Sequence, residues 1–257
     1  MATPQNGFLN SLPSATLALL TPHLQRSDLP LSREVHVVDE AIDAVWFPET
    51  ALLSMLVPAR SGDSVEAAMI GREGVAGLIE TAGSGRASAT ALVQVDGAAR
   101  SAPAAVCRRL LRDDEAFAQA TWRAVEFQMT EARQSALCQA LHPVEERLAR
   151  WLIECHDRVG GRSPLPLTQE FLAAMLGVQR TTVNAFAHLL QKAGLIRYSR
   201  GSLQILDTEG LARRACECRD VVRGHRQRLG LLHAEPRRET QAGGTVVQMS
   251  ASRTMDR

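Results

Sequence analysis

The sequence predicts an α+β fold, with strands gathered in the first half of the chain and helices in the second. Short apolar runs separated by turn residues fill the segment from Leu31 to Pro103, a rhythm typical of antiparallel sheets. Apolar residues then recur at spacings of three and four between Ala118 and Ala136, as on one long helix. After Leu167, two short amphipathic segments and a pair of strand-like runs are separated by glycines. With 257 residues and 45% hydrophobic content, the chain is long enough to bury two cores.

Residues 8–112 are expected to form an antiparallel β-roll of the double-stranded β-helix or jelly-roll kind. Between Phe8 and Leu24 the apolar residues follow helical spacing around two prolines, which predicts one or two short helices that cover the sheet. The strand-like runs that follow are short, as in a sandwich or a barrel.

Three glycines, Gly71, Gly74 and Gly77, lie in the segment GREGVAGL inside this roll. A glycine-rich bend exposes backbone amides that can hold a phosphate, with Glu73 or Arg86 available for a ribose and a phosphate. Equally, glycines at such spacing let a rolled sheet turn its corners, and the residues alone favour this structural role. The candidate effector-binding residues are Gly71, Glu73, Gly74, Arg86 and Ser88.

A long central helix is expected over residues 113–142. Pro103 opens a short helix before it, and the acidic residues from Asp113 to Glu115 suit the positive N-terminal end of the longer one. One stripe of this helix repeats at spacings of 4, 3, 4, 3 and 4, which is the heptad pattern of a helix seam. The pattern alone fits either pairing with a second copy or packing against the chain's own roll. The seam residues are Ala118, Trp122, Val125, Met129, Ala132 and Ala136.

The segment from Leu167 to Ile205 has the pattern of a helix-turn-helix followed by a wing. Thr168 is a suitable N-cap, and Gly177 supplies the left-handed residue that ends the first helix. A second helix ends at Gly194, and two short strands then follow around a tight turn at residues 200–202. The apolar stripe of the second helix is expected to comprise Val183, Phe186, Leu189 and Leu190.

The polar face of this second helix is the surface that a DNA major groove would contact. Short polar side chains and an arginine near the helix N-terminus match the donors and acceptors of base edges, and an arginine at the wing tip suits a phosphate backbone. The competing interpretation, in which two helices and a hairpin only form core, is disfavoured by the glycine turn between the helices. The candidate DNA-binding residues are Thr168, Gln169, Gln179, Arg180, Thr181, Thr182, Asn184, His188 and Arg200.

The order of these elements resembles the Crp/Fnr family of bacterial transcription regulators. The resemblance covers Phe8 to about Arg219 and is strongest in VEERLARWLIECHDRVGG, in LTQEFLAAMLGVQRTTVNAFAHLLQKAGLIRY and in the ACEC segment after the wing. It implies a cyclic-nucleotide-binding-like roll at residues 8–112, a dimerisation helix at 113–142 and a winged helix-turn-helix at 143–219. The implied partners are double-stranded operator DNA, a second copy of the chain in a homodimer, and RNA polymerase.

The sequence departs from the family's pattern in the effector pocket. Members that bind cyclic nucleotides carry a Gly-Glu-Leu triplet and, after a short helix, an arginine followed by a serine or threonine. Here Glu73 lies in an Arg-Glu-Gly triplet, and Ala87 follows Arg86. A cyclic nucleotide is therefore disfavoured as the effector, although Ser88 lies nearby.

A second departure lies on the DNA side. Arg180 matches the family's first major-groove arginine, but Thr181 and Ala185 stand where the family has a glutamate and a later arginine. Because a good bidentate base contact contributes about 1–3 kcal/mol of discrimination, we expect a different operator.

Five cysteines are scattered along the chain, which does not suggest a secreted disulfide framework. The first is Cys107, so the N-terminal cysteine cluster of the family's oxygen-sensing branch is absent, and no such iron–sulfur cluster is expected. Cys138 lies four residues before His142. Cys216 and Cys218 flank one glutamate, but the Cys-x-x-Cys spacing of structural zinc is missing. No metal ligand is therefore assigned, while a redox or metal role of Cys216 and Cys218 stays open.

Composition and charge favour a cytoplasmic DNA-binding regulator. Residues 1–100 carry 6 Arg or Lys against 11 Asp or Glu, and residues 101–257 carry 23 against 17, which fits a sensing half followed by a polyanion-binding half. No signal sequence, bilayer-spanning run, Walker loop or nucleophile elbow is found, so neither a membrane protein nor an enzyme is expected. The alternative is a cyclic-nucleotide-responsive signalling module that acts through a protein partner. Residues 224–257 are poor in large apolar side chains and are expected to be a disordered tail.

Overall fold

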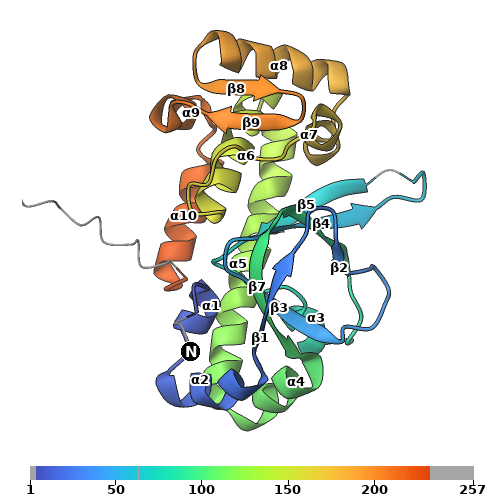
Figure 1. Cartoon of the computed structure of the whole chain (residues 1–257), viewed down its shortest axis with the longest axis vertical. Helices are drawn as coiled ribbons and strands as arrows, with labels where there is room; N and C mark the ends of the chain where they lie inside the picture. Colours follow the sequence, from blue (N-terminus) through green and yellow to red (C-terminus); the bar gives the residue numbers. More distant parts are fainter. Residues whose placement is uncertain (1–3, 63, 232–257) are drawn as a thin grey trace, which may run out of the picture.

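The computed structural model describes residues 4–62 and 64–231 and confirms the α+β fold. Figure 1 shows a rolled sheet, a long helix that runs beside it, and a helical head with a two-stranded hairpin at the upper end. Before the first strand come α1 (Gly7–Asn10), α2 (Ser14–Leu20) and the 3-10 turn η1 (Thr21–His23). Among the described residues, no helix is both long and apolar enough to cross a bilayer.

The roll consists of two antiparallel sheets. The first has the order β1 (Gln25–Leu29), β7 (Gly97–Pro103) and β3 (Ala44–Pro48). The second has the order β2 (Glu34–His36), β6 (Thr90–Val95), β4 (Leu52–Pro58) and β5 (Ser64–Ile70). Apolar side chains from both sheets, among them Trp46 and Val93, meet in one buried cluster. The glycine-rich segment leads from β5 into the short helix α3 (Leu78–Ala82).

Two helices follow the roll, α4 (Ala104–Asp113) and α5 (Glu115–Leu141). Asp114 caps α5, because its Oδ1 accepts a hydrogen bond from the Phe117 backbone N–H at 2.7 Å. At 1.5 Å per residue, α5 is about 40 Å long and reaches from the roll to the head. The buried residues of α5 are Phe117, Ala120, Thr121, Ala124, Phe127, Glu131 and Cys138.

The head follows Pro143, the residue before α6. It comprises α6 (Val144–Arg158), α7 (Gln169–Leu176), α8 (Arg180–Lys192), β8 (Ile196–Ser199), β9 (Ser202–Ile205), α9 (Thr208–Arg214) and α10 (Cys218–Arg228).

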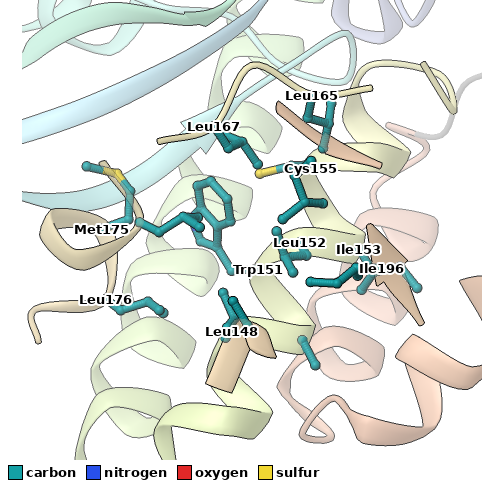
Figure 2. Packing of buried hydrophobic residues seen from close by; sticks show 14 of the residues in the cluster. Leu148, Trp151, Leu152, Ile153, Cys155, Leu165, Leu167, Met175, Leu176 and Ile196 are labelled. Carbon is teal, nitrogen blue, oxygen red and sulfur yellow. The ribbon is translucent and has the colours of Figure 1, made fainter. Parts of the chain in front are cut away.

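Trp151 of α6 lies in the core of the head. Figure 2 shows it among side chains from α6, from the loop that leads to α7, from α7 itself and from β8. Its ring also packs against Phe171 of α7, with 6.2 Å between ring centroids. Because each large apolar side chain contributes about 1.5–3 kcal/mol on burial, this cluster fixes the helix-turn-helix on α6.

The structure differs from the sequence prediction at two places in the head. Leu189 is 48% exposed, and the buried stripe of α8 consists of Val183, Ala187 and Leu190. The prediction counted Leu189 because it is apolar, although a spacing of 3.6 residues places Ala187 on the inner face. The predicted tail also begins too early, since α10 continues to Arg228 and residue 231 is a buried leucine.

That leucine explains the longer helix. Leu231 lies in one cluster with Phe127 of α5 and Val222 of α10, and Leu229 packs against it, so a few sparse apolar residues hold α10 against α5. The remainder of the predicted tail, residues 232–257, lies outside the described residues.

Candidate nucleic-acid interface

The turn between α7 and α8 has the geometry that the sequence predicts. Thr168 caps α7, with its Oγ1 accepting a hydrogen bond from the Phe171 N–H at 3.1 Å. Gly177 ends the helix at φ +63°, a left-handed conformation that side-chain-bearing residues rarely adopt. Behind this turn, the Arg147 guanidinium donates to the Leu176 carbonyl oxygen at the C-terminal end of α7. The angle between α7 and α8 is therefore held from both sides.

The outer face of α8 is polar and exposed. Arg180, Thr181, Asn184 and His188 all lie on the surface. Gln169 of α7 links two of them, because its Nε2 donates to Asn184 Oδ1 at 2.8 Å and its Oε1 accepts from Arg180 Nε at 3.4 Å. These hydrogen bonds orient the arginine and the asparagine before any ligand binds.

The wing lies beside the start of α7. β8 and β9 pair in antiparallel register, and β9 also forms a bridge to Leu165. The hairpin turns through Arg200 at φ +44° and Gly201 at φ +79°. A side chain in place of Gly201 would lie 3.4 Å from the Thr168 side chain, which shows how closely the wing tip approaches the N-terminus of α7.

The nine candidate DNA-binding residues thus come from three adjacent elements. Seven of them are exposed, and Gln169 and Thr182 are partly buried. Tyr198 was not among the candidates, but its hydroxyl donates to the Leu167 carbonyl oxygen at 2.9 Å and fastens β8 to the start of α7. Because alternate residues of a strand face the same side, an aromatic residue at this position of the strand could have indicated an inward-facing side chain.

A buried ionic junction connects the head to the rest of the chain. Arg158, at the C-terminal end of α6, is 3% exposed. Its Nη1 lies 2.5 Å from Glu73 Oε1 of the roll, and its Nη2 donates to the Glu131 carboxylate of α5. One guanidinium therefore joins all three parts of the molecule.

The two carboxyl groups of this junction differ in pKa. Burial raises the pKa of Glu73, but the positive charges of Arg158 and Arg226 and hydrogen bonds from the backbone together offset burial, so the pKa of Glu73 lies below its usual value. Burial raises the pKa of Glu131 to about 7, even though Arg158 and a hydrogen bond from it act in the opposite direction. Glu73 is thus the firmly ionised partner of Arg158.

A second carboxylate lies nearby, where β5 meets the head. Glu66 accepts hydrogen bonds from Ser54 Oγ at 2.5 Å and from Trp151 Nε1 at 2.7 Å. Burial raises the pKa of Glu66 to about 7, against those two hydrogen bonds. A polar cavity of about 30 Å³ lies between Glu66, Glu131 and Arg158, which is room for a water molecule or two.

This junction was missed at the sequence level. Residues 147, 151, 154 and 158 recur at spacings of 4, 3 and 4, so Trp151 shares one face of α6 with Arg147, Glu154 and Arg158. Charged residues on the same helix face as a tryptophan could have indicated a buried ionic site, because charged side chains are rarely buried unless they are paired.

The candidate effector residues do not share one set of partners. Glu73 is 1% exposed and directed to Arg158 and the Gly71 N–H. Arg86 is exposed and donates to the Asp39 carbonyl oxygen at 2.6 Å, while Ser88 donates to Glu80 at 2.7 Å. Gly71 and Gly74 lie in the segment between β5 and α3 and are buried and partly buried.

The predicted seam residues lie on the outer side of α5. Trp122 is 70% exposed and Met129 is 47% exposed, while Ala118 and Val125 are partly buried. The two remaining seam positions, Ala132 and Ala136, are exposed. The chain's own roll therefore packs on a different stripe of α5 and leaves this one accessible.

The cysteines and histidine noted in the sequence come together at the base of the head. Cys138 and Cys216 lie with their sulfurs 3.5 Å apart, and Cys218 Sγ lies 3.4 Å from His142 Nδ1. The hydrogen bond from Cys216 lowers the pKa of Cys138 to about 5, against the effect of burial. The same contact raises the pKa of Cys216.

Comparisons with known proteins agree with this geometry. A family model of the Crp-like helix-turn-helix domain matches residues 146–214. A search of curated proteins found no match. Three solved structures show the same overall fold at low sequence identity. FixK2 from Bradyrhizobium japonicum is 17% identical with a TM-score of 0.63, over 75% of this chain and 98% of that one.

The other two are described as regulators. A Crp/Fnr family transcriptional regulator from Thermus thermophilus is 21% identical with a TM-score of 0.60, over 74% of this chain and 98% of that one. The c-di-GMP responsive global regulator CLP from Xanthomonas campestris is 13% identical with a TM-score of 0.61, over 75% of this chain and 99% of that one. The chain thus contains a Crp-like helix-turn-helix domain at residues 146–214 and shares the overall fold of these solved structures.

Proposed function

We propose that the protein binds a two-fold-symmetric DNA operator as a homodimer, with α8 in the major groove. The observation that carries this proposal is the exposed face of α8, on which Gln169 orients both Arg180 and Asn184. An arginine can donate two hydrogen bonds to a guanine, and an asparagine can pair with an adenine in the same groove. Arg200 lies at the wing tip, which approaches the start of α7, and there it can contact a phosphate.

The residues proposed to contact DNA are those of the helix-turn-helix and wing surface. They are Thr168, Gln169, Gln179, Arg180, Thr181, Thr182, Asn184, His188 and Arg200. Thr181 and Ala185, both exposed, set the operator apart from that of regulators with a glutamate and an arginine at these positions. RNA polymerase remains a proposed partner, which transcription in vitro from a template with the selected operator would test.

The exposed seam of α5 supports the dimer. Trp122 and Val125 also line a groove of about 380 Å³ between α3, α4 and α5. Large apolar side chains exposed along one helix mark an interaction surface. A second copy on this seam would bury them and would place two heads on successive major grooves, roughly 34 Å apart.

We propose that the roll controls the head through the Arg158 junction, without a cyclic-nucleotide pocket of the usual form. The support is that Glu73 is already paired with Arg158, while Arg86 lies exposed and bonded to the Asp39 carbonyl. An effector that moves β5 or the segment after it would act on Glu73 directly, and therefore on α6.

The DNA-binding proposal is tested by measuring the affinity of the full-length protein for selected operator DNA across a range of salt concentrations. Arg200→Ala should weaken binding to all sequences and reduce the salt dependence by about one phosphate contact. Arg109→Ala is the matched control, because this exposed arginine lies on α4 at the opposite end of the molecule. Absence of any sequence-selective DNA binding would instead favour a signalling module with a protein partner.

A further inference from the structure

Four side chains with metal-binding atoms converge where α5 ends and α10 begins. They are Cys138 and His142 from the end of α5, Cys216 from the connection between α9 and α10, and Cys218 at the start of α10. Their sulfur and nitrogen atoms all lie within 4.8 Å of one another. The two pairs are more than 70 residues apart in the sequence, so only the fold brings them together.

The spacing of these atoms fits a single tetrahedral ion. Zn–S bonds of about 2.3 Å and a Zn–N bond of about 2.0 Å place tetrahedral ligand atoms about 3.5–3.8 Å from one another. The separations of 3.5 Å from Cys138 Sγ to Cys216 Sγ and 3.4 Å from Cys218 Sγ to His142 Nδ1 are already close to these values. The widest pair would have to close by about 1 Å. A cluster of several irons would instead need its cysteine sulfurs farther apart.

His142 is oriented as a metal ligand would be. Its Nδ1 faces the Cys218 sulfur, while its Nε2 lies 3.1 Å from the Glu217 carboxylate on the outer side. A carboxylate on the far nitrogen fixes the tautomer and makes the near nitrogen the better electron donor, an arrangement common behind zinc-bound histidines. The side chain of Glu217 is 70% exposed, so this contact is not imposed by burial.

The surroundings of the sulfurs also suit thiolates. Gln134 donates its Nε2–H to Cys218 Sγ at 3.1 Å. The Arg150 guanidinium on α6 interacts electrostatically with Cys138 and Cys216. Three thiolates around one Zn²⁺ leave a net charge of −1, which a nearby arginine stabilises. Cysteines that served only as small apolar fillers would not collect these polar partners.

We propose that Cys138, His142, Cys216 and Cys218 form a Cys₃His site for one Zn²⁺ ion. Soft thiolate ligands with one imidazole in tetrahedral array are typical of structural zinc. The ion binds as the three thiols lose their protons to solvent, with His142 neutral. No disulfide forms and no electron is transferred.

Such an ion would span the boundary between the central helix and the head. Cys138 and His142 lie just before Pro143, and Cys216 and Cys218 lie after α9. Zinc would therefore fix α10 to the end of α5 and limit rotation of the head about Pro143. This consequence does not depend on which DNA sequence the protein binds.

The test uses the full-length protein, purified under reducing conditions and then stripped of metal. We expect titration with Co²⁺ to produce the visible absorption of tetrahedral, thiolate-bound cobalt, saturating at one equivalent per chain. One equivalent of Zn²⁺ should then remove that absorption. Absence of the tetrahedral cobalt spectrum, or a Cys138–Cys216 disulfide in protein that binds no metal, would overturn the proposal.

Variants separate the site from the general stability of the fold. Cys218→Ser should abolish the one-equivalent cobalt spectrum, whereas Cys107→Ser, at a buried cysteine on α4, should bind cobalt as the wild type does. Glu217→Gln leaves all four metal ligands in place and changes an exposed side chain, so the variant should fold. Because it removes the carboxylate behind His142, it should bind Zn²⁺ about 10–100-fold more weakly. Unchanged Zn²⁺ affinity in both Cys218→Ser and Glu217→Gln would contradict the assigned site.

Discussion

Replacement of Arg158 by methionine should show how strongly the three parts of the chain depend on one buried guanidinium. Arg158→Met keeps an apolar stem of similar length but removes the positive charge between Glu73 and Glu131. Glu73 is 1% exposed, so its carboxylate would be left buried and without its ionic partner. Breaking a buried pair in this way typically costs about 3–5 kcal/mol. We therefore expect the free energy of unfolding to fall by about that amount.

The design includes a control and a rescue. Arg162→Met removes a roll-to-head ion pair with Asp96, which lies at 2.6 Å but has both side chains well exposed, so it should cost less than about 1 kcal/mol. The triple variant with Glu73→Gln, Glu131→Gln and Arg158→Met carries no unpaired charge and should recover part of the loss.

Urea denaturation followed by tryptophan fluorescence measures these differences, and Trp151 reports directly on the head. The reasoning is refuted if Arg158→Met costs no more than Arg162→Met. It is equally refuted if the triple variant is as unstable as Arg158→Met alone, because the penalty would then not come from an uncompensated charge.

Three further predictions concern pH, assembly and specificity. The pKa of Glu66 is raised to about 7 by burial, so the folded chain binds a proton there between about pH 4.5 and 7 that the unfolded chain does not, and stability from this group falls as pH rises through that window. Glu66→Gln should therefore gain stability relative to wild type between pH 5 and pH 8 in urea titrations, and a pH-independent difference contradicts this. Met129→Glu places a charge in the proposed dimer seam and should shift the protein from dimers to monomers, as measured by light scattering. An unchanged dimer with normal operator affinity would refute the assignment of these residues to the dimer interface. Thr181→Glu with Ala185→Arg should change the base preference in a binding-site selection by about 1–3 kcal/mol per altered contact, and an unchanged motif shows that these positions do not face bases.

Much of the fold could be predicted from local signals. Thr168 and Asp114 mark the starts of α7 and α5 because their side-chain oxygens cap these helices, and Gly177 marks the end of α7 because it adopts a left-handed conformation. Periodicity was sufficient to predict the long helix α5 but not the buried face of α8, where Leu189 is apolar and yet exposed. A single apolar residue one step off the stripe cannot be assigned from composition, because tertiary packing decides which of two adjacent residues faces inward.

The long-range features were beyond sequence patterns. Nothing local connects Glu73 with Arg158, since 85 residues separate them and their pairing depends on how the head rests on the roll. The same holds for the Cys₃His group, which the sequence presents as two unrelated pairs. Only the tertiary structure shows that the end of α5 and the start of α10 are adjacent.

Arg180 provides the most direct measurement of the central claim. Full-length protein and its Arg180→Ala and Arg109→Ala variants would each select binding sites from random double-stranded DNA at one fixed salt concentration. We predict that the wild type and Arg109→Ala recover the same two-fold-symmetric site with half-sites about one helical turn apart. Arg180→Ala should lose preference at one position in each half-site, with discrimination there falling by about 1–3 kcal/mol. Recovery of no sequence by the wild type, or of an unchanged site by Arg180→Ala, would contradict α8 as the helix that reads the operator.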